Sequence, residues 1–287
     1  MKIKIGNKYV GNNESIFITA EAGINHNGDI DIARGLIDIA SSSGCDAIKF
    51  QKRTVDIVYT KEELNKPRDS PWGTTQREQK EGIEFGKKEY DEINRYCKEK
   101  QIMWYASCWD EKSVDFIDKY NPPCYKIASA SLTDDALLRY TKSKGKPLIL
   151  STGMSTMDQI KHAIDILGEE NIIILHCTST YPSKPEELNL KVIQQFKKQF
   201  SCPIGYSGHE VGLSESIVAA SLGACMIERH ITLDRAMYGS DQSASIEPQG
   251  IRKLVKDLRE IEIILGDGNK KVYKSEIPII KKLRRNE

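Results

Sequence analysis

Residues 16–23, with the sequence IFITAEAG, decide the fold because they open a series of similar runs. Each run is short, apolar and rich in β-branched residues, and each ends in small or polar residues, as buried strands do. The other seven runs cover residues 47–51, 103–107, 124–129, 147–152, 171–178, 203–208 and 226–232. The pattern predicts eight buried strands.

The stretches between these runs carry apolar residues at i, i+3 and i+4 spacing, which predicts amphipathic helices. We expect helices over residues 30–43, 89–100, 135–144, 157–167, 186–200, 213–223 and 250–265. Thr133-Asp134 and Ser155-Thr156 are expected to cap the helices that follow them.

Strands that alternate with helices favour a parallel sheet. Residues 16–266 match the ~250 residues that a closed barrel of eight strands and eight helices needs. We therefore predict an α/β fold, a (β/α)8 TIM barrel. A doubly wound open sheet is the alternative, although no G-x-G-x-x-G follows the first strand, which argues against a dinucleotide-binding version.

Three segments follow from this reading: an arm over residues 1–15, the barrel over 16–266 and an exposed extension over 267–287. The arm contains KIKIGNKYV, which reads as a hairpin turning at Gly6-Asn7 and could close the bottom of the barrel. Residues 52–88 form a long insertion after the second strand. Because such loops are often functional, we expect a substrate lid there.

The composition excludes several classes of protein. Lys and Arg number 42 against 41 Asp and Glu, a net charge of +1, which argues against a general nucleic-acid binder. Hydrophobic residues make up 39% of the chain, too many for a disordered protein. No apolar run is long enough to span a membrane, and the start is unlike a signal peptide. The seven cysteines form no C-x-x-C pair. They read as reduced thiols, so we expect a cytoplasmic protein.

Barrel chemistry sits where the strands end, and several strand ends carry polar residues. Lys49 and Lys126 alternate with apolar neighbours, so both should point into the barrel. Buried lysines need anionic partners. One reading is a salt bridge to Glu21 or Glu228, and the other is a site for a phosphate or carboxylate substrate, helped by the hydroxyls of Ser129, Ser151 and Ser207.

His209 and His230 end two successive strands, which would place them side by side. Two imidazoles near a carboxylate suit a divalent transition metal with open positions; the alternative is two unrelated core histidines. His176 and His26 read as structural. Cysteine catalysis is not favoured, because nothing in the sequence assigns a base to Cys108 or Cys177.

Eight motifs together resemble the sialic acid synthase family, which comprises N-acetylneuraminate synthases and their legionaminic and pseudaminic acid relatives. The motifs are AEAGINHNG, KFQ, YKIAS, LSTGM, LHCTSTYP, GYSGH, IERHITLDR and GSDQSASIEP, and they run in order through residues 15–266. Each motif is weak alone, but together they make a specific signal.

This resemblance implies a TIM-barrel enzyme that condenses phosphoenolpyruvate with the open-chain aldehyde of an N-acetylated hexosamine, giving a nonulosonic acid and phosphate. It implies that His209 and His230 hold a divalent metal, manganese first, with magnesium or cobalt as alternatives. The positions that match phosphoenolpyruvate contacts are Lys49, Lys126, Ser129, Ser151 and Ser207, and those that match sugar contacts are Glu21, Gln51, Tyr181 and Asp241. Glu21 or Asp241 would handle protons, and a homodimer is expected.

The sequence also departs from the family pattern. Ser179, Cys108 and Gln242 stand where relatives often carry Asn, Thr and His, which puts the identity of the sugar in doubt. Relatives usually continue into an antifreeze-like domain that contributes an arginine to the sugar. This chain stops at Asn286-Glu287, so weak sugar binding is a further expectation.

Two rival functions stay open at this point. One is a synthase of the octulosonate type that uses another, phosphorylated aldose. It would need an extra basic cluster, for which Arg53, Arg68 and Arg77 are candidates. The other rival is an inactive barrel that serves as a binding subunit.

Overall fold

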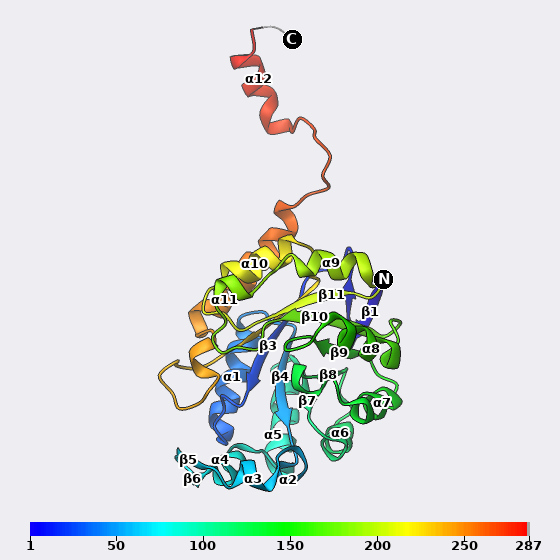
Figure 1. Cartoon of the computed structure of the whole chain (residues 1–287). Coiled ribbons are helices and arrows are strands. Elements are labelled where there is room, and N and C mark those ends of the chain that lie inside the picture. The colour runs from blue at the N-terminus through cyan, green and yellow to red at the C-terminus, as the bar shows by residue number, and fades with distance from the viewer. Residues whose placement is uncertain (286–287) are drawn as a thin grey trace.

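Eight parallel strands close into a barrel at the centre of the molecule (Figure 1). The structure is a computed structural model and describes residues 1–285. The strands, in chain order, are β3 (Phe17–Gly23), β4 (Ala47–Lys52), β7 (Met103–Cys108), β8 (Tyr125–Ile127), β9 (Leu148–Ser151), β10 (Ile172–Cys177), β11 (Ile204–Gly208) and β12 (Met226–His230). The last strand, β12, pairs with β3 and closes the barrel. The predicted TIM barrel is confirmed, and the alternative of an open sheet is wrong because no barrel strand is left as an edge.

Helices follow the strands and surround the barrel. They are α1 (Ile30–Ser42), α5 (Lys87–Glu99), α6 (Glu111–Asp118), α7 (Asp135–Ser143), α8 (Met157–Leu167), α9 (Val192–Gln199), α10 (Ser214–Ser221) and α11 (Pro248–Ile264). Both predicted caps are present: the Asp134 side chain accepts from the Leu137 N–H, and the Thr156 side chain accepts from the Gln159 N–H. The sequence reading did not single out α6.

The helix expected over residues 186–200 is shorter than the periodicity suggests. Residues Pro185–Glu187 form a separate 3-10 turn, and α9 begins only at Val192. Between them Asn189 has a φ of 40°, a left-handed conformation that cannot continue a right-handed helix. The apolar periodicity runs across this break, so it could not reveal the break.

The N-terminal hairpin packs against the apolar end of the barrel interior. It consists of β1 (Lys2–Ile5) and β2 (Lys8–Gly11), which pair antiparallel around Gly6. Its side chains Ile3, Ile5 and Val10 are buried against a layer of inward-facing strand residues that includes Phe17, Tyr105, Ile149, Ile173 and Met226. This packing fills that end of the barrel interior with apolar side chains and leaves the cavity at the opposite end, where the strands finish.

The insertion after β4 is folded rather than an irregular loop. It contains α2 (Val55–Val58), α3 (Lys61–Leu64), β5 (Pro67–Ser70), β6 (Gly73–Thr75) and α4 (Gln76–Ile83). These elements lie at the end of the barrel away from the C-terminal arm, which carries α12 (Ile277–Leu283) (Figure 1). The Trp72 ring meets the Tyr238 ring edge-on at 5.6 Å, which ties the insertion to the segment after β12. Its role as a lid remains a prediction.

The C-terminal arm extends away from the barrel (Figure 1). It belongs to the predicted extension over residues 267–287, of which the last two lie outside the described residues. Over residues 1–285, no helix has both the length and the apolar character needed to cross a bilayer.

Candidate active site

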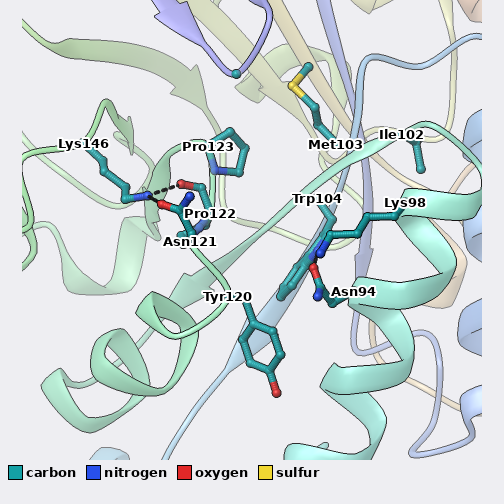
Figure 2. A pocket seen from close by; sticks show the side chains of 11 residues that line it. Asn94, Lys98, Ile102, Met103, Trp104, Tyr120, Asn121, Pro122, Pro123 and Lys146 are labelled. Carbon is teal, nitrogen blue, oxygen red and sulfur yellow. Dashed lines mark hydrogen bonds between the residues drawn. The ribbon is translucent and has the colours of Figure 1, made fainter.

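Two hollows at opposite ends of the barrel differ in chemistry. One, of about 410 Å³, lies beside Gly6 of the hairpin and is lined mainly by Trp104, Tyr120, Lys98 and Lys146 with their neighbours (Figure 2). It has no His, Asp, Glu or Cys in its lining. Acid–base or metal chemistry therefore has few candidate groups there.

The second hollow, of about 220 Å³, lies at the ends of the barrel strands. Predicted site residues make up most of its wall, which is lined by Glu21, Lys49, Gln51, Ser107, Trp109, Lys126, Ala128, Ser129, Ala130, Ser151, Met154, Ser179, Tyr181, Ser207, His209, Glu228 and His230. Asp241 is the one predicted residue outside this lining, and its Oδ2 lies 3.8 Å from His230 Nδ1. The structure thus brings the predicted residues together, while their individual roles remain predictions.

The strand register explains why these side chains meet. In the parallel ladders, His230 is level with Glu21, and Glu21 is level with Lys49. On the other side of β12, Glu228 is level with Ser207. Side chains in a strand alternate between its two faces, so Lys49 and Gln51 on β4 share one face, as do Glu228 and His230 on β12. Both pairs point into the barrel.

Glycine at position 23 lets three of these groups converge. Gly23 has a φ of 52°, and a Cβ atom there would lie 3.2 Å from Glu21 Oε1, 3.2 Å from His230 Cε1 and 3.3 Å from Gln51 Nε2. The Gln51 amide also donates to Glu21 Oε1 at 3.1 Å. A larger residue would push the carboxylate, the imidazole and the amide apart.

The two buried lysines have unequal partners. Lys49 Nζ lies 2.8 Å from Glu228 Oε1 and 3.3 Å from Glu21 Oε2, so the ion pair considered from the sequence is present. Lys126 Nζ donates to Ser151 Oγ at 2.5 Å and lies 4.0 Å from Glu228 Oε1. Lys126 is therefore the less neutralised of the two, which leaves room for the other reading, an anionic substrate.

Burial separates the proton affinities of the charged groups. Burial raises the pKa of Glu21 above its ordinary value, more than Lys49 lowers it. Burial acts in the same direction on Glu228, but Lys49 and Lys126 outweigh it, and the pKa of Glu228 falls below its usual range. Burial and the Lys49 charge lower the pKa of Lys126 to about 8. Glu21 can therefore hold a proton near neutral pH, and the Lys126 cation would gain from a nearby anion.

The histidines form a close pair with uncharged rings. The ring centroids of His209 and His230 lie 5.4 Å apart. Burial lowers the pKa of each to about 3, with each also repelled by neighbouring groups. His209 Nδ1 lies 2.7 Å from Thr178 O and donates to it, which leaves Nε2 to accept from the Tyr181 hydroxyl at 3.0 Å. Neutral imidazoles are suited to bind a divalent metal, and the bond to Thr178 O sets the tautomer of His209.

The residues fit a metal through two imidazoles. The His230 Nδ1 atom is buried and has no hydrogen-bond partner among the described residues, with the Asp241 carboxylate as the nearest acid. Within residues 1–285, no group of three or more His, Cys, Asp or Glu side chains is arranged to hold a metal ion. The donor set is therefore two imidazoles and one carboxylate at a longer distance, and the metal remains a prediction.

Hydroxyl and thiol groups gather around Gly153, at the ends of β8, β9 and β10. The Gly153 N–H donates to Ser129 Oγ at 3.0 Å and to Cys177 Sγ at 3.1 Å. A Cβ atom at position 153 would lie 2.1 Å from Ser179 Oγ, so a larger residue there would have to displace that hydroxyl. The bond from Gly153 holds the Ser129 hydroxyl at the cavity wall, which the Ser179 side chain also lines.

The residues expected from the sequence to be structural make structural contacts. His176 Nε2 lies 2.7 Å from Leu188 O, and the His26 ring stacks on Phe85 at 3.9 Å. Burial raises the pKa of the Cys108 thiol well above its ordinary value, which disfavours a reactive thiolate.

From the sequence, Glu228 is expected only as an ion-pair partner of the buried lysines, and Trp109 and Met154 are not predicted at the site. The spacing supports a place for Glu228 in the cavity, because it is two residues before His230 on one strand and must share its face. Trp109 and Met154 sit just beyond strand ends, where no periodicity reports direction.

The insertion brings basic residues towards the loop of Asp241. Arg53 pairs with Glu84 at 2.7 Å and its guanidinium lies 5.3 Å from the Trp109 ring. Lys80 Nζ lies 5.1 Å from the Tyr59 ring, and burial together with Arg53 and Arg68 lowers its pKa to about 8. Of the three arginines considered from the sequence, Arg77 is also paired, with Asp56 and Glu81 at 2.8 and 2.9 Å, whereas Arg68 forms no ion pair within residues 1–285.

Comparisons with known proteins identify the family of this chain. A family model described as the NeuB family matches residues 36–270. The N-acetylneuraminate-9-phosphate synthase of Homo sapiens is 40% identical over 96% of this chain and 78% of its own length. The N,N'-diacetyllegionaminic acid synthase of Legionella pneumophila is 35% identical over 98% of this chain and 82% of its own. A crystal structure of N-acetylneuraminic acid synthetase from Leptospira borgpetersenii, in complex with citrate, has a TM-score of 0.87 and 32% identity, and the match covers 100% of this chain and 98% of that one.

Proposed function

Because this chain belongs to the NeuB family, we propose that it condenses phosphoenolpyruvate with the open-chain aldehyde of an N-acetylated hexosamine. The products are a nonulosonic acid and inorganic phosphate, and the enzyme is a C–C bond-forming transferase of the sialic acid synthase type. One observation carries the proposal: two lysines, several hydroxyls and two neutral histidines line one cavity at the strand ends. This set offers an anion site and an electrophile site side by side.

The lysines and hydroxyls suit phosphoenolpyruvate, which carries a phosphate and a carboxylate. Among the described residues, Lys126 has no carboxylate closer than 4.0 Å, and it therefore supplies a weakly paired cation. Lys49 is held by Glu228 and Glu21 and supplies a second positive group whose position is fixed. The hydroxyls of Ser129, Ser151 and Ser207 add donors that offset desolvation of the anion. These five residues are the proposed phosphoenolpyruvate site.

His209 and His230 would hold the divalent metal, with manganese as the first candidate. When bound, the metal supplies Lewis acidity toward the sugar aldehyde. The Tyr181 hydroxyl, 3.0 Å from His209 Nε2, and the Asp241 carboxylate stand next to this pair. Replacing both histidines by alanine should abolish phosphate release and leave the circular dichroism spectrum unchanged. A double variant that keeps its rate would refute the metal assignment.

The reaction joins C3 of phosphoenolpyruvate to the aldehyde carbon, while water adds at C2 and phosphate leaves. The aldehyde oxygen gains a proton and the water loses protons. Glu21 is suited to exchange a proton near neutral pH because burial raises its pKa. Asp241, whose pKa burial also raises, is the second candidate. Gln51, bonded to Glu21, is proposed to orient this carboxyl and the sugar.

The test is phosphate release from phosphoenolpyruvate in the presence of manganese. The acceptors are N-acetylmannosamine, its 2,4-diacetamido relatives, and unmodified and phosphorylated aldoses. We expect release with an aminosugar and none without an acceptor. Release only with a phosphorylated aldose that lacks the acetamido group would favour the octulosonate type, and no release with any acceptor would contradict the proposal.

A second candidate concerns the acceptor, and the basic residues of the insertion favour it. In residues 1–285, Lys80 and Arg68 form no ion pair. Arg53 donates to Tyr59 Oη at 3.1 Å, and Lys80 Nζ lies over the ring of the same tyrosine. Burial, together with the nearby cations Arg53 and Arg68, lowers the pKa of Lys80, and such a cation would gain from a phosphate. The acceptor would then be the 6-phosphate of the aminosugar. A Lys80→Met variant that loses affinity for the phosphorylated acceptor and not for the free sugar would support it; equal affinities in the wild type would contradict it.

We also infer a homodimer that acts in the cytoplasm. The C-terminal arm exposes four apolar side chains, which a second copy of the chain can cover: Tyr273, Ile277, Ile279 and Leu283. All seven cysteines are free, as in a reducing compartment. Light scattering coupled to size exclusion should give twice the chain mass, and a monomer at micromolar concentration would refute the dimer.

A further inference from the structure

Arg229 lies on β12, directly before His230, and its side chain is almost fully buried, at 1% exposed. It is also among the largest fully buried side chains in the part of the chain that the structure describes. Its guanidinium lies 2.8 Å from Glu210 Oε1. The same group donates to three further oxygens: Glu210 O at 2.5 Å, Gly212 O at 2.8 Å and Ser216 Oγ at 2.9 Å.

Arg229 and Glu210 form an ion pair, and each is next to one of the two candidate metal ligands in the chain. Arg229 stands between Glu228 and His230 on β12, and because strand side chains alternate, it points outward where they point into the cavity. Glu210 directly follows His209 after β11. The ion pair therefore joins the two residues that are the chain neighbours of the two histidines.

Glu210 is fixed from the other side as well. The Tyr206 hydroxyl donates to Glu210 Oε2 at 2.8 Å, and the Ser216 hydroxyl of α10 donates to Glu210 Oε1 at 3.4 Å. Both carboxylate oxygens and two backbone carbonyls of the loop after β11 are thus held by buried donors. Such a network leaves the loop little freedom to shift relative to β12.

We propose that Arg229 and Glu210 are positioning residues that fix the separation of His209 and His230 and so set the affinity of the site for a divalent metal. The inference rests on the proposed function, since it takes the two histidines as metal ligands. Neither residue lines the cavity, so each acts through its neighbouring histidine rather than on the substrate. Outer groups that orient metal ligands typically change metal affinity by ~10–100-fold when they are replaced.

The conservative variant Arg229→Lys separates positioning from charge. Lysine keeps the positive charge, but a single ammonium on a shorter stem cannot reach Glu210 Oε1, Glu210 O and Gly212 O together. The loop after β11 would lose at least one anchor while the buried carboxylate keeps a cation. We expect a folded protein in which the two imidazoles are less well fixed.

The experiment measures Mn²⁺ binding to the wild-type chain and to variants by electron paramagnetic resonance of the free ion. Arg229→Lys should raise the Kd for Mn²⁺ by ~10-fold or more, while the Kd for phosphoenolpyruvate without metal stays unchanged. Glu210→Gln, which keeps the shape but not the charge, should raise the Mn²⁺ Kd in the same direction. Turnover at saturating Mn²⁺ should recover most of the wild-type rate.

Arg259→Lys is the matched control. Arg259 also bonds a carboxylate and a backbone carbonyl, with Asp46 Oδ2 at 2.9 Å and Ile16 O as partners, but it lies at the end of the barrel where the strands begin. This variant should lose stability to thermal unfolding and keep the wild-type Mn²⁺ affinity.

The possible failures are distinguishable. If Arg229→Lys is destabilised as much as Arg259→Lys but binds Mn²⁺ like the wild type, the pair is only structural and the inference is wrong. If the wild-type chain binds no Mn²⁺, the metal assignment itself fails, and the role of the pair fails with it.

Discussion

At the scale of single residues, the two buried lysines of the site differ in how closely carboxylates pair with them. Lys49 is shared by Glu228 and Glu21, whereas Lys126 is bonded to a hydroxyl and a backbone carbonyl. A buried cation without a close anion costs free energy in the free protein and recovers it when an anion binds. This difference predicts that the two lysines respond differently to removal.

Lys126→Met should weaken phosphoenolpyruvate binding by ~10–100-fold, the loss of one or two charge-assisted hydrogen bonds. It should leave thermal stability unchanged or raised, because it removes a poorly paired buried charge. Lys49→Met should weaken binding too, but it strands Glu228 and should cost about 3–5 kcal/mol of stability. Calorimetric titration and thermal unfolding check both variants. Equal stability losses would contradict the account of Lys126.

His26 gives a pH-dependent contribution to stability. Burial lowers its pKa from 6.5 to about 3 in the folded chain. Below pH 6.5 the unfolded chain therefore binds a proton that the folded chain excludes, and stability is lost as the pH falls from 6.5 towards 3. A His26→Gln variant should have a shallower loss, by up to about 1.4 kcal/mol per pH unit.

Urea unfolding at pH 7 and pH 5 measures this difference. The control is His162→Gln, since that imidazole lies on the surface. If His26→Gln loses as much stability between the two pH values as the wild type does, burial of a neutral His26 is not the cause.

At the scale of elements, the sequence predicts best what repeats. All eight strands were predictable because each is a buried apolar run, and their register then determines which side chains face the cavity. The start of α9 was not predictable, because the break at Asn189 depends on one left-handed residue within an unbroken apolar period. The insertion's hairpin β5–β6 was not predictable because its strands, PRDS and GTT, are short and carry no alternating apolar side chains. Asp241 was predictable only through the family resemblance.

Gly82 of α4 decides how the insertion packs. A Cβ atom there would lie 2.1 Å from Trp72 Cγ, so Gly82→Ala must displace the indole that contacts Tyr238. In an ordinary helix this change stabilises by about 1 kcal/mol. Here we expect lower stability and, if the insertion is a lid, a KM for the sugar raised several-fold with the KM for phosphoenolpyruvate unchanged.

Steady-state kinetics with each substrate varied checks this prediction. Gly86→Ala is the matched control in the same segment, since its Cβ atom would meet Glu89 Oε2 at an ordinary 3.4 Å. A Gly82→Ala enzyme with wild-type KM values for both substrates would rule out the lid.

At the scale of the whole molecule, the two ends of the barrel differ: one is packed with apolar side chains and the other holds the polar cavity. The hairpin and an apolar layer fill the end where strands begin, and charged groups occupy the end where they finish. The insertion and the segment after β12 border that end and contact each other through Trp72 and Tyr238. One cavity at that end suits a reaction in which two substrates must be held together before water reaches them.

The most direct test of the central claim follows the carbon atoms. The enzyme is supplied with phosphoenolpyruvate labelled with ¹³C at C3, with Mn²⁺ and the aminosugar that gives phosphate release. Carbon-13 NMR should show the label moving from the vinyl CH₂ to an aliphatic CH₂ of a nine-carbon 2-keto acid, with one phosphate released per product. Label found only in the methyl group of pyruvate would mean that no C–C bond forms, and the account of this protein as a condensing enzyme would be wrong.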